Sequence, residues 1–410
     1  MKYVVLVGDG MADETIQELG GKTPLEFAET PNIDKIAALG LTGEIRTVPE
    51  GFPPGSDVAT LSLMGYDPAR YYTGRAPLEA ASMGIALGPK DVAYRCNLIT
   101  LEVLGQSIIM RDFTAGHISS EEARQLINGL NEAVADNEIR FHPGVSYRHL
   151  MVWKNGGDDV ALTPPHDILE QSIADYMPQG TDAEKIIQWM TSAQIYLKHH
   201  PVNQKRMAKG ENPANSIWLW GQGKKPVLPT FKELYGLTGG VVSAVDLIKG
   251  LGILAGLEAP RVEGATGYLD TNYAGKVAAA LKILEGNDFV FLHVEAPDEA
   301  GHSGILADKV RAIADFDRHV VGPMFDALQA YRPFRLLVLP DHPTPLSLRT
   351  HTNGTVPFLA YDSEGAYSSL LDSPPPFSET GAEASPIKFK KGHRLLEAWL
   401  NANLNPGEPS

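Results

Sequence analysis

The sequence of 410 residues predicts an α/β protein whose mostly parallel sheet lies between helices and whose chain is interrupted by a smaller α+β unit. Three observations predict it. Helix-like and strand-like segments alternate at the start of the chain and again from about residue 240, as in parallel βαβ units. Strand-like runs with two helices occupy residues 91–224. Gly-, Pro- and Lys-rich segments lie near both transitions, which suits a pair of linkers.

The first segment predicts a strand followed by helices. Residues 2–7 are an apolar run, and TPNIDKIAALG has helical spacing with a stop at Gly40. The run DVATLSLMG predicts a further helix, which begins directly after a Pro-Pro-Gly turn. Ser56 therefore lies at the amino end of this helix.

The middle segment predicts a mixture of strands and helices. Its strands are YRCNLITLE, SIIMRDF, RFHPGVSYRHLMVW and NSIWLWG, and its helices are SSEEARQLINGLNEAV and DAEKIIQWMTSAQIYL. We therefore expect residues 1–90 and 225–410 to form one discontinuous domain, and residues 91–224 to form an inserted domain. Two linkers suit a hinge, so the insertion is expected to act as a lid.

Charge and composition exclude several classes of function. The formal net charge of −15 argues against nonspecific binding to nucleic acids or anionic membranes, because both depend on a basic surface. No stretch reaches the roughly 18–20 apolar residues of a membrane span, and the chain starts with a strand rather than a signal peptide. We therefore expect a cytoplasmic protein. Cys96 is the single cysteine, and its apolar surroundings predict a buried thiol.

Acidic residues and histidines follow three apolar strands, in YVVLVGDG, DFVFLHVEAPDEAGH and RLLVLPDH. The carboxyl ends of parallel strands meet at one edge of an open sheet, where ligands of α/β proteins bind. Each residue alone could be a solvated loop residue or a cap, but together they predict a metal site. The candidate ligands are Asp9, Asp298, His302, Asp341, His342 and His351.

The mixture of carboxylates and imidazoles favours manganese, zinc, iron or cobalt over a site made of oxygen ligands alone. Two divalent ions would outweigh the charge of Asp9, Asp298 and Asp341, and the excess positive charge would attract an anion such as phosphate. Ser56 is the candidate nucleophile, because the amino end of a helix favours a developing alkoxide. The alternative is that Ser56 only caps the helix.

Several motifs together carry a resemblance to a known family. They are VGDGMAD, PGSDVATLSLMGYDP, YYTGRAPLEAASMGI, PDEAGHSG, LPDHPTP and THTNGTVPF. The chain resembles the cofactor-independent phosphoglycerate mutases of the archaeal type, in the alkaline phosphatase superfamily. The resemblance covers residues 1–90 and 260–400 and is looser in the insertion. In the bacterial and plant branch a Glu-Val-Gly-His run follows the nucleophile, whereas here Ser56 is followed by Asp-Val-Ala.

The resemblance implies an alkaline-phosphatase-like core that binds two divalent metal ions, with manganese expected first and zinc, cobalt or magnesium as alternatives. One ion would be held by Asp298, His302 and His351, and the other by Asp9, Asp341, His342 and the oxygen of Ser56. Ser56 would take the phosphoryl group from 3-phosphoglycerate and return it to give 2-phosphoglycerate, a step of glycolysis and gluconeogenesis. The reaction would need no 2,3-bisphosphoglycerate.

Candidate substrate-binding residues lie in the insertion. Arg111 and Asp112 resemble an Arg-Asp pair that binds substrate in the family, and an Arg can grip a carboxylate or phosphate with two hydrogen bonds. Arg95, Arg148 and His149 are further candidates beside strand-like runs. Solvated surface charge or a structural ion pair is the alternative for each of them.

Two further expectations concern the core segments. Lys276, in TNYAGKVAAAL, is expected at a solvated helix position, with a phosphate contact as the alternative. Residues 372–386, DSPPPFSETGAEASP, have a composition typical of disorder. A mobile loop near the site is the other interpretation of that segment.

Two rival functions remain open from the sequence. The first keeps the site but changes the acceptor, as in a phosphatase or a homoserine kinase-like phosphotransferase, because lids decide acceptors. The second is a noncatalytic protein that senses phosphate or metal, for which Ser56 would be dispensable.

Overall fold

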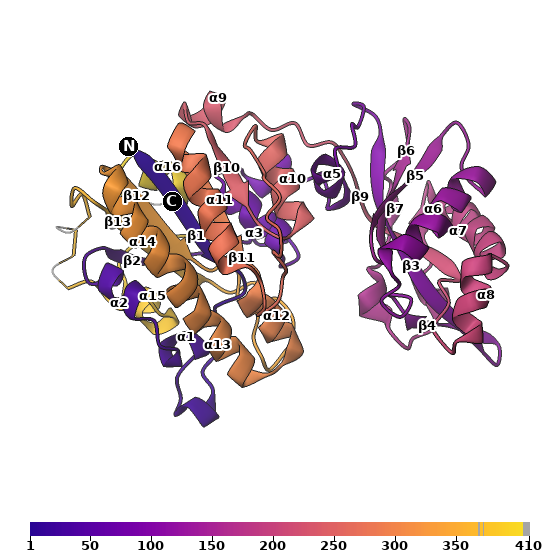
Figure 1. The fold of residues 1–410 in the computed structure, drawn as a ribbon, viewed down its shortest axis with the longest axis horizontal. Coiled ribbons are helices and arrows are strands. Elements are labelled where there is room, and N and C mark those ends of the chain that lie inside the picture. Colours follow the sequence, from indigo (N-terminus) through magenta and orange to yellow (C-terminus); the bar gives the residue numbers. More distant parts are fainter. Residues whose placement is uncertain (368–369, 372, 405–410) are drawn as a thin grey trace. The chain divides into compact units, whose positions relative to one another are not determined.

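The computed structural model describes residues 1–367, 370–371 and 373–404 (Figure 1). The chain divides into two compact units. The core unit combines Met1–Tyr72 with the described residues from Val227 onward, and the inserted unit is Thr73–Pro226. The first junction precedes the expected boundary at residue 90, because helix α5 (Ala76–Ser82) packs on strands of the inserted unit. The second lies close to the expected boundary at residues 224–225.

A seven-stranded sheet forms the centre of the core unit, and its first four strands run parallel. Each of the two central pairings places Val5 of the first strand beside an apolar partner, Phe291 on one side and Leu337 on the other. In order across the sheet, the strands are β10 (Gly239–Val242), β11 (Phe289–Val294), β1 (Lys2–Gly8), β12 (Phe334–Leu339), β13 (Val356–Asp362), β2 (Leu41–Ile45) and β14 (Lys388–Phe389).

Helices cover both faces of this sheet, so the predicted α/β class is confirmed (Figure 1). Strand β1 is apolar on both sides, as expected for a strand buried between two helical layers. Its Val4 and Leu6 pack against helices of one layer, whereas Tyr3 meets Trp399 of the other layer edge to face. The first layer contains α2 (Pro31–Ala37), α11 (Tyr273–Gly286), α13 (Leu306–Phe316) and α14 (Gly322–Leu328), and the second contains α3 (Ser56–Leu63), α10 (Asp246–Leu254) and α16 (Leu395–Leu400).

The remaining helices of the core unit are short. They are α1 (Pro24–Phe27), α4 (Pro68–Tyr71), α9 (Phe231–Tyr235), α12 (Ala296–Ser303) and α15 (Glu379–Ala384). Across the described residues, no helix of either unit is both long and apolar enough to cross a membrane.

The inserted unit is built on an antiparallel sheet, and helices pack on both of its faces. Strand β3 pairs with β6 and β9 over its first part and with β4 over its last part, in each case antiparallel. Its strands are β3 (Val92–Leu104), β4 (Ser107–Asp112), β5 (Ile139–Val145), β6 (Arg148–Trp153), β7 (Val160–Ala161), β8 (Gln179–Gly180) and β9 (Ser216–Lys224). Its helices after α5 are α6 (Ser120–Ala133), α7 (Ala183–Lys198) and α8 (Pro201–Ala208).

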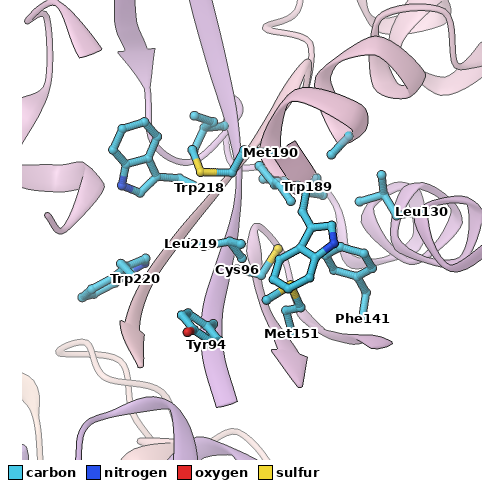
Figure 2. Close-up of a cluster of buried hydrophobic side chains, with 14 of the residues drawn as sticks. Tyr94, Cys96, Leu130, Phe141, Met151, Trp189, Met190, Trp218, Leu219 and Trp220 are labelled. Carbon is cyan, nitrogen blue, oxygen red and sulfur yellow. The ribbon is translucent and has the colours of Figure 1, made fainter. Parts of the chain in front are cut away.

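The inserted unit has its own apolar core (Figure 2). Tyr94 and Cys96 of β3 lie among Phe141, Met151 and Trp189 in one continuous cluster. Cys96 is buried, as its sequence context predicts, and burial raises the pKa of its thiol. A separate core in each unit fits independent packing of the insertion and the surrounding chain.

The disorder predicted for residues 372–386 is wrong for the part that forms α15, and residue 372 lies outside the described residues. Ser378 caps α15 by accepting a hydrogen bond from the Gly381 amide. The Glu379 carboxylate accepts hydrogen bonds from the Asp13 amide at 3.0 Å and from Oγ1 of Thr23 at 2.7 Å. These tertiary contacts order a segment whose composition alone favours disorder.

Candidate metal centre

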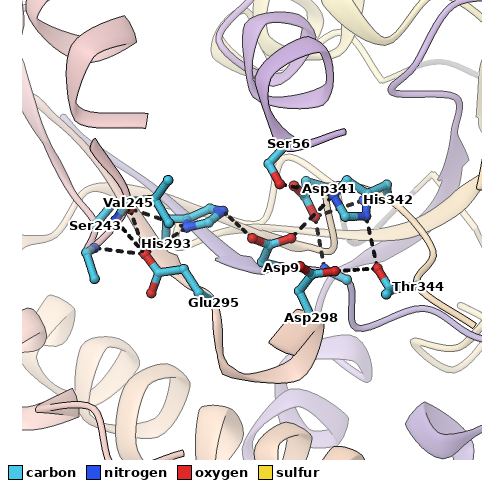
Figure 3. Close-up of polar contacts among 12 residues, drawn as sticks. Asp9, Ser56, Ser243, Val245, His293, Glu295, Asp298, Asp341, His342 and Thr344 are labelled. Atoms are coloured by element: carbon cyan, nitrogen blue, oxygen red, sulfur yellow. Dashed lines mark hydrogen bonds and ion pairs between the residues drawn. The ribbon is translucent and has the colours of Figure 1, made fainter. Parts of the chain in front are cut away.

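Three parallel strands end side by side and carry the predicted ligands to one edge of the core sheet. Strand β1 lies between β11 and β12, so Asp9 emerges between the two neighbouring strand ends. The Asp9 amide donates to the Val294 carbonyl at 2.9 Å, and the Gly10 amide donates to Oδ1 of Asp341 at 3.0 Å. Figure 3 shows the Asp9, Asp298 and Asp341 carboxylates gathered in one place.

Gly10 permits this close approach of strand ends. Its φ is +60°, and a Cβ atom there would lie 2.5 Å from both Oδ1 of Asp298 and Oγ1 of Thr344. A side chain at this position would therefore collide with the cluster, and its backbone conformation would be strained.

One predicted group combines Asp298, His302 and His351. Helix α12 brings Asp298 and His302 together one turn apart, with Nε2 of His302 3.1 Å from Oδ2 of Asp298. Nε2 of His351 lies 3.4 Å from Oδ1 of Asp298 and 3.0 Å from Nε2 of His302. These three side chains meet as the sequence predicts.

The second predicted group surrounds Nε2 of His342. This atom lies 3.4 Å from Oδ1 of Asp9, 3.3 Å from Oδ2 of Asp341 and 3.1 Å from Oγ of Ser56. The irregular chain after β12 allows the adjacent Asp341 and His342 to face the same point, as the flanking prolines suggest. All seven predicted metal and nucleophile residues therefore lie in one cluster.

Ser56 does not act as a helix cap. The cap position of α3 is Gly55, and Ser56 is the first residue of the helix. Gly55 has no side chain that could cap the helix, and Oγ of Ser56 contacts His342. The hydroxyl is thus directed at the carboxylate and imidazole cluster, at the end of a helix that favours negative charge.

The electrostatics of the cluster reflect three carboxylates in a buried place. Burial, followed by the charges of Asp341 and Asp298, raises the pKa of Asp9 well above its usual value. Burial alone would raise the pKa of Asp298, but hydrogen bonds from His302 and His351 hold it well below its usual range. Burial opposes protonation of His302, yet its hydrogen bond to Asp298 raises the His302 pKa to about 9. The raised pKa values mean that Asp9 and His302 hold protons more tightly. These protons offset negative charge that bound cations would otherwise neutralise.

Several buried donor atoms of the cluster are better suited to binding a cation than to hydrogen bonding with one another. Among the described residues, Oδ1 of Asp9, Oδ2 of Asp341 and Nε2 of His293 are buried and have no hydrogen-bond partner. Burial lowers the pKa of His342, which keeps its imidazole neutral and able to donate a lone pair to a metal. Buried polar atoms without partners are rare, and here they converge.

Two sets of atoms are close enough together to share an ion. Within each set the donor atoms all lie within 4.8 Å of one another. One set is Asp298, His342 and His351, and the other is Asp9, His293 and Asp341. This division places His342 with Asp298 and His351, whereas the family resemblance places it with Asp9 and Asp341. It also adds His293, which was not among the ligands predicted from the sequence.

A buried polar chain behind Asp9 was missed from the sequence. Nζ of Lys276 is fully buried and contacts Glu295 and the carbonyl of His293, so the prediction of a solvated Lys276 is wrong. Helix α11 lies on β11, which places Lys276 beside the strand end. The signal was a charged residue, Glu295, at the end of an apolar strand, three positions before Asp298.

The candidate residues of the inserted unit do not form one cluster. Arg95 of β3 and Arg148 of β6 share one face of the sheet, because Arg95 pairs with Leu150 and Arg148 pairs with Asn97. His149 faces the other side, where burial lowers its pKa to about 3. The structure therefore separates His149 from the two arginines.

Arg95 lies in a positively charged place. Its guanidinium lies 4.1 Å from the centre of the Trp220 ring, and its Nε lies 3.2 Å from Glu79. Burial lowers the pKa of Arg95, Glu79 opposes this, and Arg75 and Arg148 lower it further. Positive charge from Arg75 and Arg148 thus acts on the Arg95 guanidinium, an arrangement that favours binding of an anion.

Arg111 and Asp112 have other partners. Arg111 is half exposed and lies 3.6 Å from Glu102 and 3.4 Å from Glu170. Both carboxylate oxygens of Asp112 accept hydrogen bonds, from Thr114, Gly116 and Asn212. Burial opposes these bonds, but together they lower the pKa of Asp112.

Comparison with known proteins gives one consistent family. The family model described as 2,3-bisphosphoglycerate-independent phosphoglycerate mutase matches residues 37–203. A probable 2,3-bisphosphoglycerate-independent phosphoglycerate mutase of Geobacter sulfurreducens is 52% identical over 98% of this chain and 100% of its own length. The 2,3-bisphosphoglycerate-independent phosphoglycerate mutase of Methanosarcina acetivorans is 55% identical over 89% of this chain and 92% of its own.

Solved structures agree with the sequence relatives. A Pyrococcus horikoshii protein has a TM-score of 0.78 at 27% identity, covering 100% of this chain and 98% of its own. The cofactor-independent phosphoglycerate mutase of Thermoplasma acidophilum has a TM-score of 0.64 at 25% identity, covering 98% and 100%. The resemblance found in the motifs is therefore confirmed over nearly the whole chain. This chain belongs to the family of 2,3-bisphosphoglycerate-independent phosphoglycerate mutases, which are isomerases.

Proposed function

We propose that this chain interconverts 3-phosphoglycerate and 2-phosphoglycerate through a phosphoserine at Ser56, beside two divalent metal ions. The observation that carries the proposal is the position of Oγ of Ser56, 3.1 Å from Nε2 of His342 at the centre of the Asp and His cluster. Membership of the mutase family supports the substrate class. The phosphoserine replaces a bisphosphorylated cofactor, because Ser56 itself stores the transferred group.

The clustered carboxylates and imidazoles suit two cation positions. Asp298, His302 and His351 would hold one ion, and Asp9, Asp341 and His342 would hold the other beside Ser56. The mixed oxygen and nitrogen donors support manganese first, with zinc, cobalt or magnesium as alternatives. When bound, such ions lower the pKa of a hydroxyl and neutralise charge on a transferring phosphoryl group.

The chemistry of Ser56 is a balanced pair of transfers. Its Oγ forms a bond to phosphorus while the bond from phosphorus to the C3 oxygen of the substrate breaks. The proton of the Ser56 hydroxyl ends on that oxygen, which leaves free glycerate. After the glycerate turns, its C2 hydroxyl attacks phosphorus, the bond to Oγ breaks, and Ser56 regains a proton. The amino end of α3 favours negative charge on Oγ in both steps.

We propose that the inserted unit retains the glycerate as a lid. Arg95 and Arg148 are the main candidates for binding the carboxylate of the glycerate. They share a face of the sheet on which their two positive charges outweigh the negative charge of the nearby Glu79. Arg111 and Asp112 stay predictions from the family resemblance, and their surface and loop contacts would have to change on binding. His149 is the weakest of the five candidates, since it faces the apolar core.

The test measures three products with one preparation. Formation of 2-phosphoglycerate from 3-phosphoglycerate is compared with release of phosphate and with ATP-dependent phosphorylation of homoserine. We expect the first to dominate and to stop when a chelator removes the metal. Dominant phosphate release or homoserine phosphorylation would overturn the mutase assignment and favour a rival acceptor.

A second measurement addresses the intermediate. Mass spectrometry of peptides from enzyme quenched during turnover should detect one phosphoryl group on Ser56. Full turnover by Ser56→Ala would contradict the covalent route. Metal binding without any turnover in the wild type would instead support the sensor alternative.

A further inference from the structure

The imidazole of His293 is a buried group that the proposed reaction has not used. It is the penultimate residue of β11 and is completely buried. Figure 3 shows it between Glu295 on one side and Asp9 on the other. Its Nδ1 lies 3.3 Å from Oε1 of Glu295, and its Nε2 lies 3.3 Å from Oδ2 of Asp9.

Glu295 is fixed as a hydrogen-bond acceptor. Its Oε1 accepts from Oγ of Ser243 at 2.7 Å and from the Ala244 and Val245 amides at 2.8 and 3.2 Å. Its Oε2 pairs with the buried ammonium of Lys276. A carboxylate with these partners is held ionised and can only accept, so the nitrogen of His293 that faces it must carry the hydrogen.

This tautomer decides what Nε2 can do. A neutral imidazole with hydrogen on Nδ1 presents a lone pair at Nε2. Nε2 has no hydrogen-bond partner among the described residues, and Oδ1 of Asp9 and Oδ2 of Asp341 are likewise without one. Lone pairs of a nitrogen and of two carboxylates then face one another in a buried space, an arrangement that is repulsive unless a cation lies among them.

We propose that His293 is a further metal ligand, binding through Nε2 the ion held by Asp9 and Asp341. The inference rests on the proposed metal centre and deepens it. Its geometric basis is that the donor atoms of these three residues lie within 4.8 Å of one another. A histidine ligand whose other nitrogen donates to a carboxylate is the usual arrangement around protein-bound metals, and Glu295 supplies that carboxylate.

The proposal explains why Lys276 is buried. Lys276 neutralises Glu295 and donates to the backbone carbonyl of His293 rather than to its imidazole, so Glu295 can orient His293 while adding no net negative charge to the site. The second ion gains a nitrogen ligand beyond those implied by the family resemblance. Such a site favours zinc, cobalt or manganese over magnesium.

The test uses metal-stripped full-length protein and titration calorimetry with Zn²⁺. The wild type should bind two ions, and His293→Gln should weaken one of them at least tenfold while leaving the other unchanged. Glu295→Gln should weaken the same ion by about 10–100-fold, because it loosens the orientation of His293. His149→Gln is the matched control, since it removes a buried histidine of the inserted unit; its metal affinities should equal those of the wild type. Thermal unfolding of each metal-stripped variant checks that it is folded.

A crystal structure of the wild type with Zn²⁺ gives the direct readout. Nε2 of His293 should lie about 2.0–2.1 Å from the ion bound to Asp9. A distance beyond about 3 Å from every ion, or unchanged affinities in His293→Gln, would overturn the role of His293 while leaving two bound ions and the proposed function intact. Failure of the wild type to bind any ion would instead overturn the proposed metal centre itself.

Discussion

A buried arginine of the inserted unit and the buried aspartates at the sheet edge of the core unit differ in how their polar atoms are satisfied. In the inserted unit, the buried guanidinium of Arg206 donates to Glu122 at 2.8 Å, to the Ala115 carbonyl at 2.9 Å and to the Asn212 carbonyl at 2.9 Å. In the core unit, Asp9 and Asp341 each bury an oxygen with no hydrogen-bond partner among the described residues. The first charge stabilises a loop, whereas the second arrangement is unfavourable by itself.

This difference separates structural charge from functional charge. A buried ion with a full set of hydrogen bonds can repay its desolvation, but converging carboxylates cannot do so without a cation. Perturbed groups with such an arrangement are characteristic of functional sites.

Removal of the Ser56 hydroxyl should have the largest effect. We expect Ser56→Ala to lower mutase turnover by roughly 10⁴-fold or more, because the group that carries the phosphoryl is lost. Metal affinity should fall far less, since the histidine and aspartate ligands remain. The rate of 2-phosphoglycerate formation measures this, with Ser62→Ala in the same helix as the control. Comparable losses in the two variants would indicate a general defect in α3.

Removal of the Lys276 ammonium should be the largest stability change. We expect Lys276→Met to lower the free energy of unfolding by about 3–5 kcal/mol, because Glu295 is left as an unpaired buried charge. Lys282→Met in the same helix removes an exposed partner of Glu285 and should lower the free energy of unfolding far less. Urea denaturation compares them, and equal losses would contradict the structural role of the buried pair.

In the inserted unit, Arg95 should affect substrate binding rather than folding of the core. We expect Arg95→Ala to raise KM for 3-phosphoglycerate by about 10–100-fold, as for loss of a charge-assisted hydrogen bond. Arg124→Ala, which removes an exposed arginine of α6, is the control and should leave KM unchanged. An unchanged KM in Arg95→Ala would show that the positive face of β3 does not meet the substrate.

The smallest predicted effect concerns pH and Glu379. Burial raises the pKa of Glu379 to about 7, against hydrogen bonds from Asp13 and Thr23 that lower it. The folded state therefore holds this proton more tightly than the unfolded chain. The stabilisation is complete below about pH 4.5 and is lost as pH rises through about 7.

We expect the stability of the wild type relative to Glu379→Gln to fall by about 1–2 kcal/mol between pH 5 and pH 8, after allowance for partial exposure. Glu383→Gln, on the same helix, is the control for a general effect of removing an acid from α15. Denaturation midpoints at both pH values measure the difference. A wild-type advantage that grows with pH would contradict the predicted sign.

The sequence predicted those features that follow from local pattern. Apolar strands ending in Asp9, Asp298 and Asp341 sufficed to predict both the parallel sheet and the gathering of the acids at one edge, because strand direction fixes where the ends lie. His342 could be added because it adjoins a predicted ligand. These residues needed no knowledge of long-range packing.

Features that depend on contacts between distant segments were missed. Lys276 has the pattern of an ordinary helix position, and only the packing of α11 on β11 shows that its ammonium meets Glu295. The order of α15 likewise depends on Glu379 reaching Asp13 and Thr23, far away in the chain. The inserted unit begins at Thr73 rather than at the expected residue 91, because α5 packs on β3.

The most direct test of the central claim counts metal ions. Mass-spectrometric analysis of metal in the reconstituted chain should give two divalent ions per wild-type molecule. It should give one after Asp298→Asn and one after Asp341→Asn, while the exposed Asp326→Asn keeps both. No bound ion in the wild type, or two ions in all three variants, would contradict a two-cation centre beside Ser56.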